Sequence, residues 1–482
     1  MSASQKQKEA ESTKGCRVCV NRRIRCDLQR PFCQKCIKKG LACPGYGPRI
    51  KWVGGVAARG RLRGRKVPTS QQDESRSLGA AAMTARSASL TDGDGELGFF
   101  TGLIEYYGKS IAGLMVWLDT DQNDYRRHVL PLAKSEPGLR LAVAAIAAHH
   151  GSNLFPHNPP NFPELARDAC LGFVKQGAKE MTNRLTTGSG LASSTDMVGG
   201  EWMLASVLIM ICFEMVQSRL EVAECHKQAA RTIVNVFGPT AAGRSHLFRF
   251  LQNQLAIHDV LASTTSFNLA DVQNTITPPA NSETALFADY LTSLHRVTLA
   301  SRQVAHHSSE TVDSMRSQRM SASFVHNLFE QARGSTLMAA GRLHVNNSKN
   351  RRDLIHLVEV YHKAALLYSY RCMGLETLGA VTYAEHHLLA LQLPDELLQF
   401  SDQQLCIQNL PWPALVAGTE CHGDRERQAK VVKIFLDIYE ATKFKHYLEI
   451  LEFLETFWDG PWTDWRPLAQ EWEMAGRRII PV

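Results

Sequence analysis

The sequence contains no long run of apolar residues. Its longest uncharged apolar stretch, from Trp202 to Phe213, is shorter than the roughly 20 residues that a membrane-spanning helix needs. The first fifteen residues, MSASQKQKEAESTKG, contain no apolar signal core. We therefore expect a soluble protein that is neither secreted nor associated with a membrane.

No group of residues has the spacing of a catalytic site. Gly108-Lys109-Ser110 matches part of a phosphate-binding loop, but Gly102 is one residue too far away. Three histidine pairs are adjacent, whereas a helical zinc site places its histidines four apart; they are His149-His150, His306-His307 and His386-His387. We predict that the chain is not an enzyme and that these pairs lie at helix ends or on the surface.

Acidic residues are scarce at the N-terminus. The first 70 residues contain 18 lysines and arginines but only 3 acidic residues, a net charge of +15, whereas the whole chain carries +7. The remaining residues therefore carry −8. A small cationic segment before a mildly acidic body predicts that the segment binds a polyanion.

The composition is that of a folded protein. The chain has 482 residues, of which 44% are hydrophobic and 21% charged, so it is long enough for two or three domains. Residues 1–15 are expected to be disordered, and 71–98 are small and polar and predict a flexible linker. The other predicted segments are 16–46 (a cysteine-rich domain), 47–70 (a basic arm) and 99–482 (a packed body).

Six of the twelve cysteines form a dense cluster with the pattern C-x2-C-x6-C repeated twice; they are Cys16, Cys19, Cys26, Cys33, Cys36 and Cys43. In a reducing compartment such a cluster predicts metal binding rather than disulfides. Six thiolates are two short of the eight that two separate tetrahedral zinc sites need, so two must bridge. By the internal symmetry, Cys16 and Cys33 are the bridging candidates. One ion would then also bind Cys19 and Cys26, and the other Cys36 and Cys43.

All six cysteines, and the basic run between the second and third, match the pattern of the fungal Zn2Cys6 binuclear cluster transcription factors, which this segment resembles. Cys26-Asp27 and Pro31 also fit. The resemblance implies two Zn2+ ions, double-stranded DNA as partner and action in the nucleus. The alternative from the residues alone is a zinc cluster that only stabilises a small fold or binds protein.

The run between Cys19 and Cys26 is expected to be a short helical stretch with three arginines. Arginine binds guanine O6 and N7 with two hydrogen bonds, and the family's corresponding positions contact a CGG triplet in the major groove. By that resemblance Arg22 and Arg23 are the base-reading candidates. The candidates for phosphate contacts are Arg17, Arg25, Lys35, Lys38 and Lys39.

The basic arm contains two arginine-glycine-arginine units, formed by Arg59, Arg61, Arg63 and Arg65. They resemble the core of an AT-hook, which places arginines in a narrow minor groove, although the usual proline is missing. A nuclear-import signal or a solvated linker would explain the same residues.

The body is predicted to be almost wholly helical, because its apolar residues recur every three or four positions. One such stripe is Val222, Cys225, Ala229, Ile233 and Phe237. Another runs from Asp353, a candidate N-cap, to Gly374, a candidate stop. It places one apolar face toward the core, formed by Leu354, Leu357, Val358, Tyr361, Ala365 and Tyr368. Helices are also expected from Arg425 to Thr442 and from Tyr447 to Trp458.

The scattered cysteines and the late aromatic segment are expected to pack in the core. The cysteines are Cys170, Cys212, Cys225, Cys372, Cys406 and Cys421, with a redox or electrophile sensor as the alternative. The aromatic segment is FLETFWDGPWTDWRPLAQEW, for which a ligand pocket is the alternative to core closure.

The body resembles the fungal-specific transcription factor domain, on segments such as AVAAIAAHHG and YHKAALLYSYRCMG. This implies a helical regulatory domain without catalysis. The fold prediction is therefore mainly α: a small Zn2Cys6 domain, a flexible linker and a large helical body. The predicted function is an RNA polymerase II regulator that reads CGG-like triplets, with a metabolic gene cluster as target and co-regulators or the transcription machinery as partners. A homodimer through the body, a monomer, and a body that responds to a metabolite or redox signal stay open.

Overall fold

The computed structural model describes residues 19, 22, 24–27, 33–39, 94–155, 159, 161–187, 193–240, 242–279, 286–307, 320–343, 347–401 and 406–482. Of residues 37, 94–99, 242, 306 and 307 only the backbone is described. The chain divides into two compact units, one formed by 1–72 with 178–190 and the other by 73–177 with 191–482.

All regular structure in the described ranges is helical, which confirms the prediction of a mainly α protein. The first unit contains the short helix α2 (Gln34–Ile37). The larger unit, the helical body, begins with α4 (Asp94–Tyr106), so the chain becomes helical five residues before the expected start at Phe99. The short π and 3-10 helices are η1 (Tyr107–Ile111), η2 (Ala112–Met115), η3 (Tyr125–Val129), η4 (Ala242–Arg244), η5 (Leu375–Thr377) and η6 (Ile407–Asn409).

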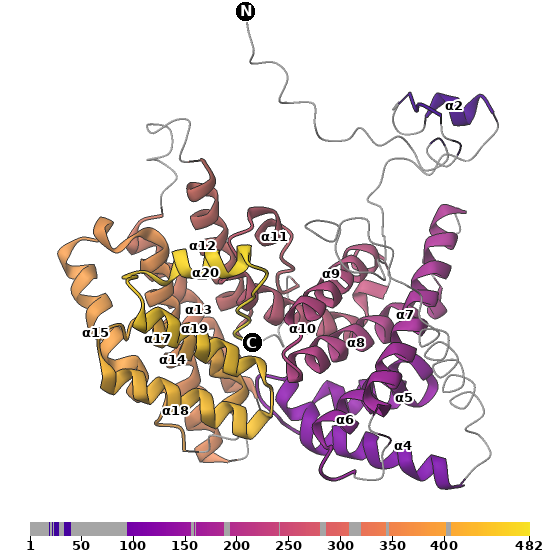
Figure 1. Cartoon of the computed structure of the whole chain (residues 1–482), viewed down its shortest axis with the longest axis horizontal. Coiled ribbons are helices and arrows are strands. Elements are labelled where there is room, and N and C mark those ends of the chain that lie inside the picture. The colour runs from indigo at the N-terminus through magenta and orange to yellow at the C-terminus, as the bar shows by residue number, and fades with distance from the viewer. Residues whose placement is uncertain are drawn as a thin grey trace, which may run out of the picture. The chain divides into compact units, whose positions relative to one another are not determined.

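The other α-helices of the body follow in chain order and are labelled in Figure 1. They are α5 (Leu130–Ser135), α6 (Pro137–His150), α7 (Phe162–Thr186), α8 (Ser194–Val216), α9 (Leu220–Phe237), α10 (His246–Ser263), α11 (Leu269–Gln273), α12 (Ala288–His307), α13 (Ala322–Arg342), α14 (Ser348–Met373), α15 (Ala380–Glu396), α17 (Pro411–Thr419), α18 (Arg425–Thr442), α19 (His446–Asp459) and α20 (Trp465–Met474).

Helix α8 is the central helix of the early half of the body, packed against α6, α9 and α10. It begins with a capping box in which Ser193 and Asp196 satisfy each other's backbone N–H groups. Its length and composition would allow it to cross a membrane, but 78% of its most apolar window is buried inside the protein. A helix that is apolar all round and covered by other helices is a core helix.

Helix α14 confirms the predicted buried face, since the six residues from Leu354 to Tyr368 named for it are all buried. The predicted N-cap is wrong: the helix begins at Ser348 and is capped by the side chain of Asn347. Asp353 lies one turn inside, where its buried carboxylate accepts the backbone N–H of Ser401 at 2.9 Å. Gly374 ends the helix with φ of +90°, a conformation that favours glycine.

Helix α9 ends at Phe237, the last residue of its predicted apolar stripe, but that stripe is partly wrong. Val222 and Cys225 are exposed. The buried face instead includes Lys227 and Arg231. These cations are buried because they pair with carboxylates of neighbouring elements, Lys227 with Asp259 at 3.5 Å and Arg231 with Asp271 at 2.6 Å.

Early and late parts of the body are interlocked, and Figure 1 shows α4–α9 meeting the late helices around α10. The Asn409 side chain donates to the carbonyl of Trp117 at 2.7 Å, and the Gln408 side chain to that of Val116 at 3.0 Å. The late aromatic segment closes this core, as predicted, with Phe457, Trp465 and Trp472 buried.

Candidate zinc cluster and nucleic-acid interface

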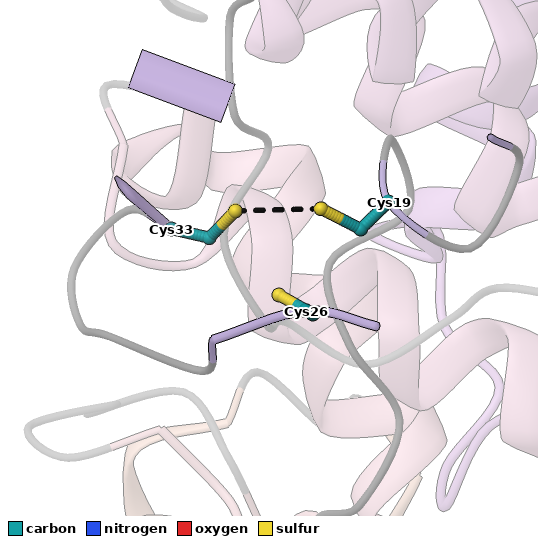
Figure 2. Close-up of side chains that lie close together, drawn as sticks. All are labelled: Cys19, Cys26 and Cys33. Carbon is teal, nitrogen blue, oxygen red and sulfur yellow. Dashed lines mark hydrogen bonds between the residues drawn. The ribbon is translucent and has the colours of Figure 1, made fainter. Parts of the chain in front are cut away.

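Three cysteine thiols converge in the first unit. The Sγ atoms of Cys19, Cys26 and Cys33 all lie within 4.8 Å of one another, and Figure 2 shows them directed at a common point. The Cys19 and Cys33 sulfurs are 3.5 Å apart, and that of Cys36 is 3.9 Å from Cys19. With Zn–S bonds of 2.3 Å, sulfur atoms around a tetrahedral zinc lie about 3.8 Å apart. The thiols that the structure describes therefore fit a zinc cluster.

Two of these four cysteines, Cys33 and Cys36, belong to the first turn of α2 and its N-cap. Cys33 is its N-cap, and the Cys33 sulfur accepts the backbone N–H of Cys36 at 3.3 Å. The Asp27 carboxylate accepts two further free N–H groups, from Gln34 at 3.2 Å and from Lys35 at 2.8 Å. The sequence analysis did not assign this role to Asp27. Its signal was an acidic residue next to a cluster cysteine, but nothing in the spacing showed which helix it would cap.

The stretch between Cys19 and Cys26 is not helical throughout, contrary to the expectation. Cys19 is helical and Arg22 lies in a turn, but residues 24–27 have no regular structure. The backbone N–H of Ile24 donates to the carbonyl of Cys19 at 3.0 Å. A bond that spans five residues closes a helix end, so the chain leaves the helix before Ile24.

The described basic residues are on the surface. Arg22, Arg25, Lys35, Lys38 and Lys39 are all exposed. The Lys35 ammonium donates to the backbone carbonyl of Arg25 at 2.7 Å, which joins the two basic segments. Exposed cations therefore occur on both described segments of the first unit, at Arg22 and Arg25 and at Lys35, Lys38 and Lys39.

The remaining predicted site residues lie outside the described residues. They are Cys16, Arg17, Arg23, Cys43, Arg59, Arg61, Arg63 and Arg65, together with residues 1–15 and the basic arm at 47–70.

The cysteines of the body follow the packing prediction in part. Cys170, Cys212, Cys406 and Cys421 are buried, whereas Cys225 is exposed and Cys372 half-buried. Burial raises the pKa of Cys170, Cys212 and Cys421 to about 12. A thiol that stays protonated at neutral pH reacts slowly with oxidants and electrophiles, which argues against a sensor at these positions.

Of the four histidines in the described pairs, His387 is exposed, His386 is buried and the other two are half-buried. His149 and His150 end α6, as expected, but they are half-buried. The His150 Nε2–H donates to the Thr442 carbonyl at 3.0 Å and its Nδ1 accepts from the Tyr106 hydroxyl at 2.9 Å. His386 is buried, 3.3 Å from a Glu420 carboxylate oxygen, and His387 is exposed. The side chains of His306 and His307 are outside the described residues.

The buried charges of the body are paired. Arg371 binds both carboxylate oxygens of Glu420, at 2.6 and 2.7 Å, and His386 lies on the same carboxylate. Burial alone would raise the pKa of Glu420, but the hydrogen bonds from Arg371 and His386 outweigh it and hold that pKa below its ordinary value. This group has the geometry of a structural ion pair between α14, α15 and the end of α17.

Two family models match the sequence. Residues 102–471 match the fungal specific transcription factor domain, and residues 14–52 match the fungal Zn(2)-Cys(6) binuclear cluster domain. Neither matched domain is an enzyme. No solved structure matches the chain.

Two curated relatives are similar to a short segment of the chain. The arginine metabolism regulation protein II of Saccharomyces cerevisiae is 42% identical over 43 residues, which are 9% of this chain and 5% of that protein. The acriflavine sensitivity control protein acr-2 of Neurospora crassa is 42% identical over 45 residues, 9% of this chain and 8% of its own. The likeness therefore covers less than a tenth of this chain and of each relative. Since the match at 102–471 covers most of the helical body, the chain belongs to the family with the fungal specific transcription factor domain, and its binuclear cluster domain holds two zinc ions.

Proposed function

We propose that this chain is a nuclear, zinc-dependent DNA-binding regulator of RNA polymerase II transcription. The observation that carries the proposal is the set of exposed cations, Arg22, Arg25, Lys35, Lys38 and Lys39, on the same chain segments as the convergent cysteine thiols. Six thiolates and two zinc ions sum to a charge of −2, so the cluster itself repels DNA. Attraction to phosphates then has to come from these side chains.

Sequence reading is assigned to Arg22 and Arg23, each by two hydrogen bonds to guanine in a CGG-like triplet. Arg22 is exposed in a turn next to the zinc-binding thiol of Cys19, so its guanidinium has access to a groove. A metal-anchored backbone also limits how far the arginine can move, which favours bidentate recognition. The remaining cations, with Arg17, position the phosphates.

The six cysteines of the cluster are assigned as zinc ligands, with Cys16 and Cys33 bridging. For the first ion, Cys19 and Cys26 are the proposed non-bridging ligands and Cys33 is a bridging ligand. The convergence of their three sulfur atoms supports this set. Domain boundaries at 16–46, 47–70, 71–98 and 99–482 go with this assignment, the last segment being the regulatory body.

The basic arm is assigned to the minor groove of A/T-rich flanks. Replacing Arg59, Arg61, Arg63 and Arg65 with alanine is expected to weaken binding to sites with A/T-rich flanks more than to others. An equal loss on every flank would support a solvated linker instead, and nuclear exclusion of the variant would support an import signal.

For a homodimer through the body, which the sequence leaves open beside a monomer, the candidate contact face lies on α15. Val381, Ala384, Leu388 and Leu391 recur at helical spacing and are all exposed, Val381 at 85%. An exposed apolar stripe of this kind is typical of an interaction face. Leu388→Glu with Leu391→Glu is expected to halve the mass seen by light scattering, whereas Val222→Glu, at another exposed apolar residue, is not; an unchanged mass leaves co-regulators or the transcription machinery as partners of this face.

Selection of bound sequences from random duplex DNA by the zinc-loaded full chain tests the function. We expect enrichment of a CGG-like triplet, its loss in Cys26→Ser, and its retention in the matched control Cys225→Ser, an exposed cysteine outside the cluster. One triplet or two would separate monomer from dimer. Absence of any enriched triplet would overturn DNA reading. The similarity to a yeast regulator of arginine metabolism supports a metabolic gene cluster as target. Mapping the promoters that the protein binds in cells would test this.

A further inference from the structure

A second group of side chains of metal-ligand type lies in the helical body and contains no cysteine. It consists of Asp124, His128 and His246, whose ligand atoms all lie within 4.8 Å of one another. His128 Nε2 is 3.5 Å from one Asp124 oxygen, and His246 Nε2 is 4.0 Å from the other. Their arrangement carries an inference beyond the proposed DNA-binding function.

The spacing of the three ligand atoms suits a small divalent ion. Around a tetrahedral zinc with bonds near 2.0 Å to nitrogen or oxygen, neighbouring ligand atoms lie about 3.3 Å apart. The observed distances from the histidine Nε2 atoms to the carboxylate, 3.5 and 4.0 Å, are slightly longer. Small rotations of the side chains would bring these atoms to the distance that zinc requires. The two imidazole rings, 5.5 Å apart at their centroids and inclined by 57°, both face the carboxylate.

The backbone on both sides of the group is fixed. Asp124 and His128 are carried by η3, where the buried Asn123 accepts the backbone N–H of Tyr125 at 2.9 Å and donates to the Ala112 carbonyl at 2.9 Å. Single π-helical turns of this kind often occur at functional sites. Tyr125 is buried and packs edge-on against Phe250, one turn beyond His246 on α10. This ring pair sets the distance between the two elements that supply ligands.

The start of α10 is held independently. Ser245 caps the helix and donates to the Glu201 carboxylate of α8. His246 is therefore placed by a helix that is anchored to the central helix of the body. A site built on such elements needs little reorganisation to close around an ion.

The charges around the site leave the carboxylate to the histidines. Arg126 is occupied by Asp119, at 2.6 Å for one of its nitrogens, and Arg127 donates to Gln122. Among the described residues, the ion-pair partners of Asp124 are the two histidines. One carboxylate and two neutral imidazoles carry −1, which favours a divalent cation. The positive end of the α10 dipole opposes this within one turn, so an exchangeable rather than a permanent ion is expected.

We propose that Asp124, His128 and His246 form a separate, exchangeable site for a divalent transition-metal ion of the zinc class. Two imidazoles and a carboxylate are ligands that zinc accepts, and three protein ligands leave the fourth position to water. The His246 side chain is 65% exposed, so ions and water reach the site from solvent. A bound ion would link η3 to α10 and stabilise the body against unfolding.

Metal stoichiometry of the full chain tests the site. After dialysis against buffered micromolar free Zn2+, we expect one zinc ion per chain beyond the two of the cluster. The extra ion should be lost in the double variant His128→Gln/His246→Gln and kept in His387→Gln, which removes an exposed histidine of α15. It should also persist in Cys26→Ser, which damages the cluster, so failure of the DNA-binding proposal and failure of this one are distinguishable.

Two further readouts address folding of the variants. Added Zn2+ should raise the Tm of the wild type but not of the double variant, and Asp124→Asn alone should weaken the extra site at least about tenfold, as loss of a metal-binding contact commonly does. With Co2+ as the probe, this site should give no thiolate charge-transfer band, unlike the cluster. The proposal is overturned if the wild type binds no extra zinc, or if the folded Asp124→Asn and double variants bind it as the wild type does.

Discussion

Asp27 and Lys35 connect the same two chain segments by two hydrogen bonds, one through the Asp27 side chain and one through the Lys35 side chain. Asp27 accepts the backbone N–H of Lys35 at 2.8 Å, and the Lys35 ammonium reaches back to the Arg25 carbonyl at 2.7 Å. The N-terminus of α2 is thereby attached to the residues that follow Arg22. The proposed zinc ligands Cys26 and Cys33 lie next to these residues in the sequence.

Asp27→Ala is expected to weaken zinc retention. The change removes the acceptor of two N–H groups at the start of α2, a loss of about 1 kcal/mol. Since folding of small zinc domains is coupled to metal binding, the apparent zinc affinity should fall about fivefold, measured by competition with a chromophoric chelator. Asp27→Asn keeps one acceptor oxygen and should lose less. Equal zinc retention in all three proteins would show that the cap contributes nothing.

Arg22 and Lys38 should fail in different ways when replaced by alanine. Arg22→Ala removes a proposed base contact, so the preference for the selected triplet over a mutated one should fall by about 1–3 kcal/mol. Lys38→Ala removes a proposed phosphate contact, so all sequences should bind more weakly and the log–log salt slope should fall by about 1. Titrations at several salt concentrations measure both. A uniform loss for Arg22→Ala would reassign it to the phosphates.

His446 should make the body less stable in mild acid. Its side chain is fully buried, and burial lowers its pKa to about 3. Below the unfolded value near 6.5 the unfolded chain takes up a proton that the folded chain does not, so stability is present above that pH and is lost as pH falls. The loss is about 1.4 kcal/mol per pH unit for this group.

Urea unfolding between pH 6 and pH 5 measures that slope. His446→Gln should be flatter by about 1.4 kcal/mol per pH unit, whatever its effect on stability at neutral pH, and His387→Gln at an exposed position should run parallel to the wild type. Parallel curves for His446→Gln would mean that His446 is not the titrating group.

Glu420→Gln should destabilise the body strongly. It leaves Arg371 and His386 at a buried site without their carboxylate, and breaking such a pair costs about 3–5 kcal/mol. The matched control is Lys433→Ala, which breaks the surface pair with Asp437 and should cost less than about 1 kcal/mol. Denaturant unfolding of both variants checks the contrast; similar losses would place Glu420 in a water-like environment.

The helices of the body were predicted well where apolar residues recur regularly and poorly where they do not. The bounds of α18, from Arg425 to Thr442, were predicted as observed; the helix begins after its N-cap Asp424 and ends before Lys443, whose backbone is left-handed. The start of α14 was missed because its first turn, SKNRR, lies outside the apolar core and has no periodic pattern. On α9 the error came from buried charges. Lys227 and Arg231 point inward to their carboxylates, and an apolar count ignores such residues.

The two candidate metal sites also differ in how far the sequence predicts them. The cysteine spacing alone predicted the zinc cluster, because its ligands are close together in sequence and fixed in type. Asp124 and His128 are four residues apart, but their third ligand, His246, belongs to a helix far along the chain. A search for paired histidines passes over such a group. Only the packing of Tyr125 on Phe250 brings the parts together.

The hydrogen bond between Asn409 and Trp117 has a consequence for the protein during its synthesis. The two residues are 292 positions apart, so at about 5–20 residues per second the ribosome delivers Asn409 roughly 15–60 s after Trp117. For that interval the nascent chain lacks the late residues, such as Asn409, that complete the structure around the buried Trp117. The cysteine cluster, translated earlier, can take up zinc meanwhile. In the cell, chaperones should therefore bind mainly to the helical body. Truncated transcripts should yield a protein with a metal-loaded cysteine cluster and an incomplete body that aggregates.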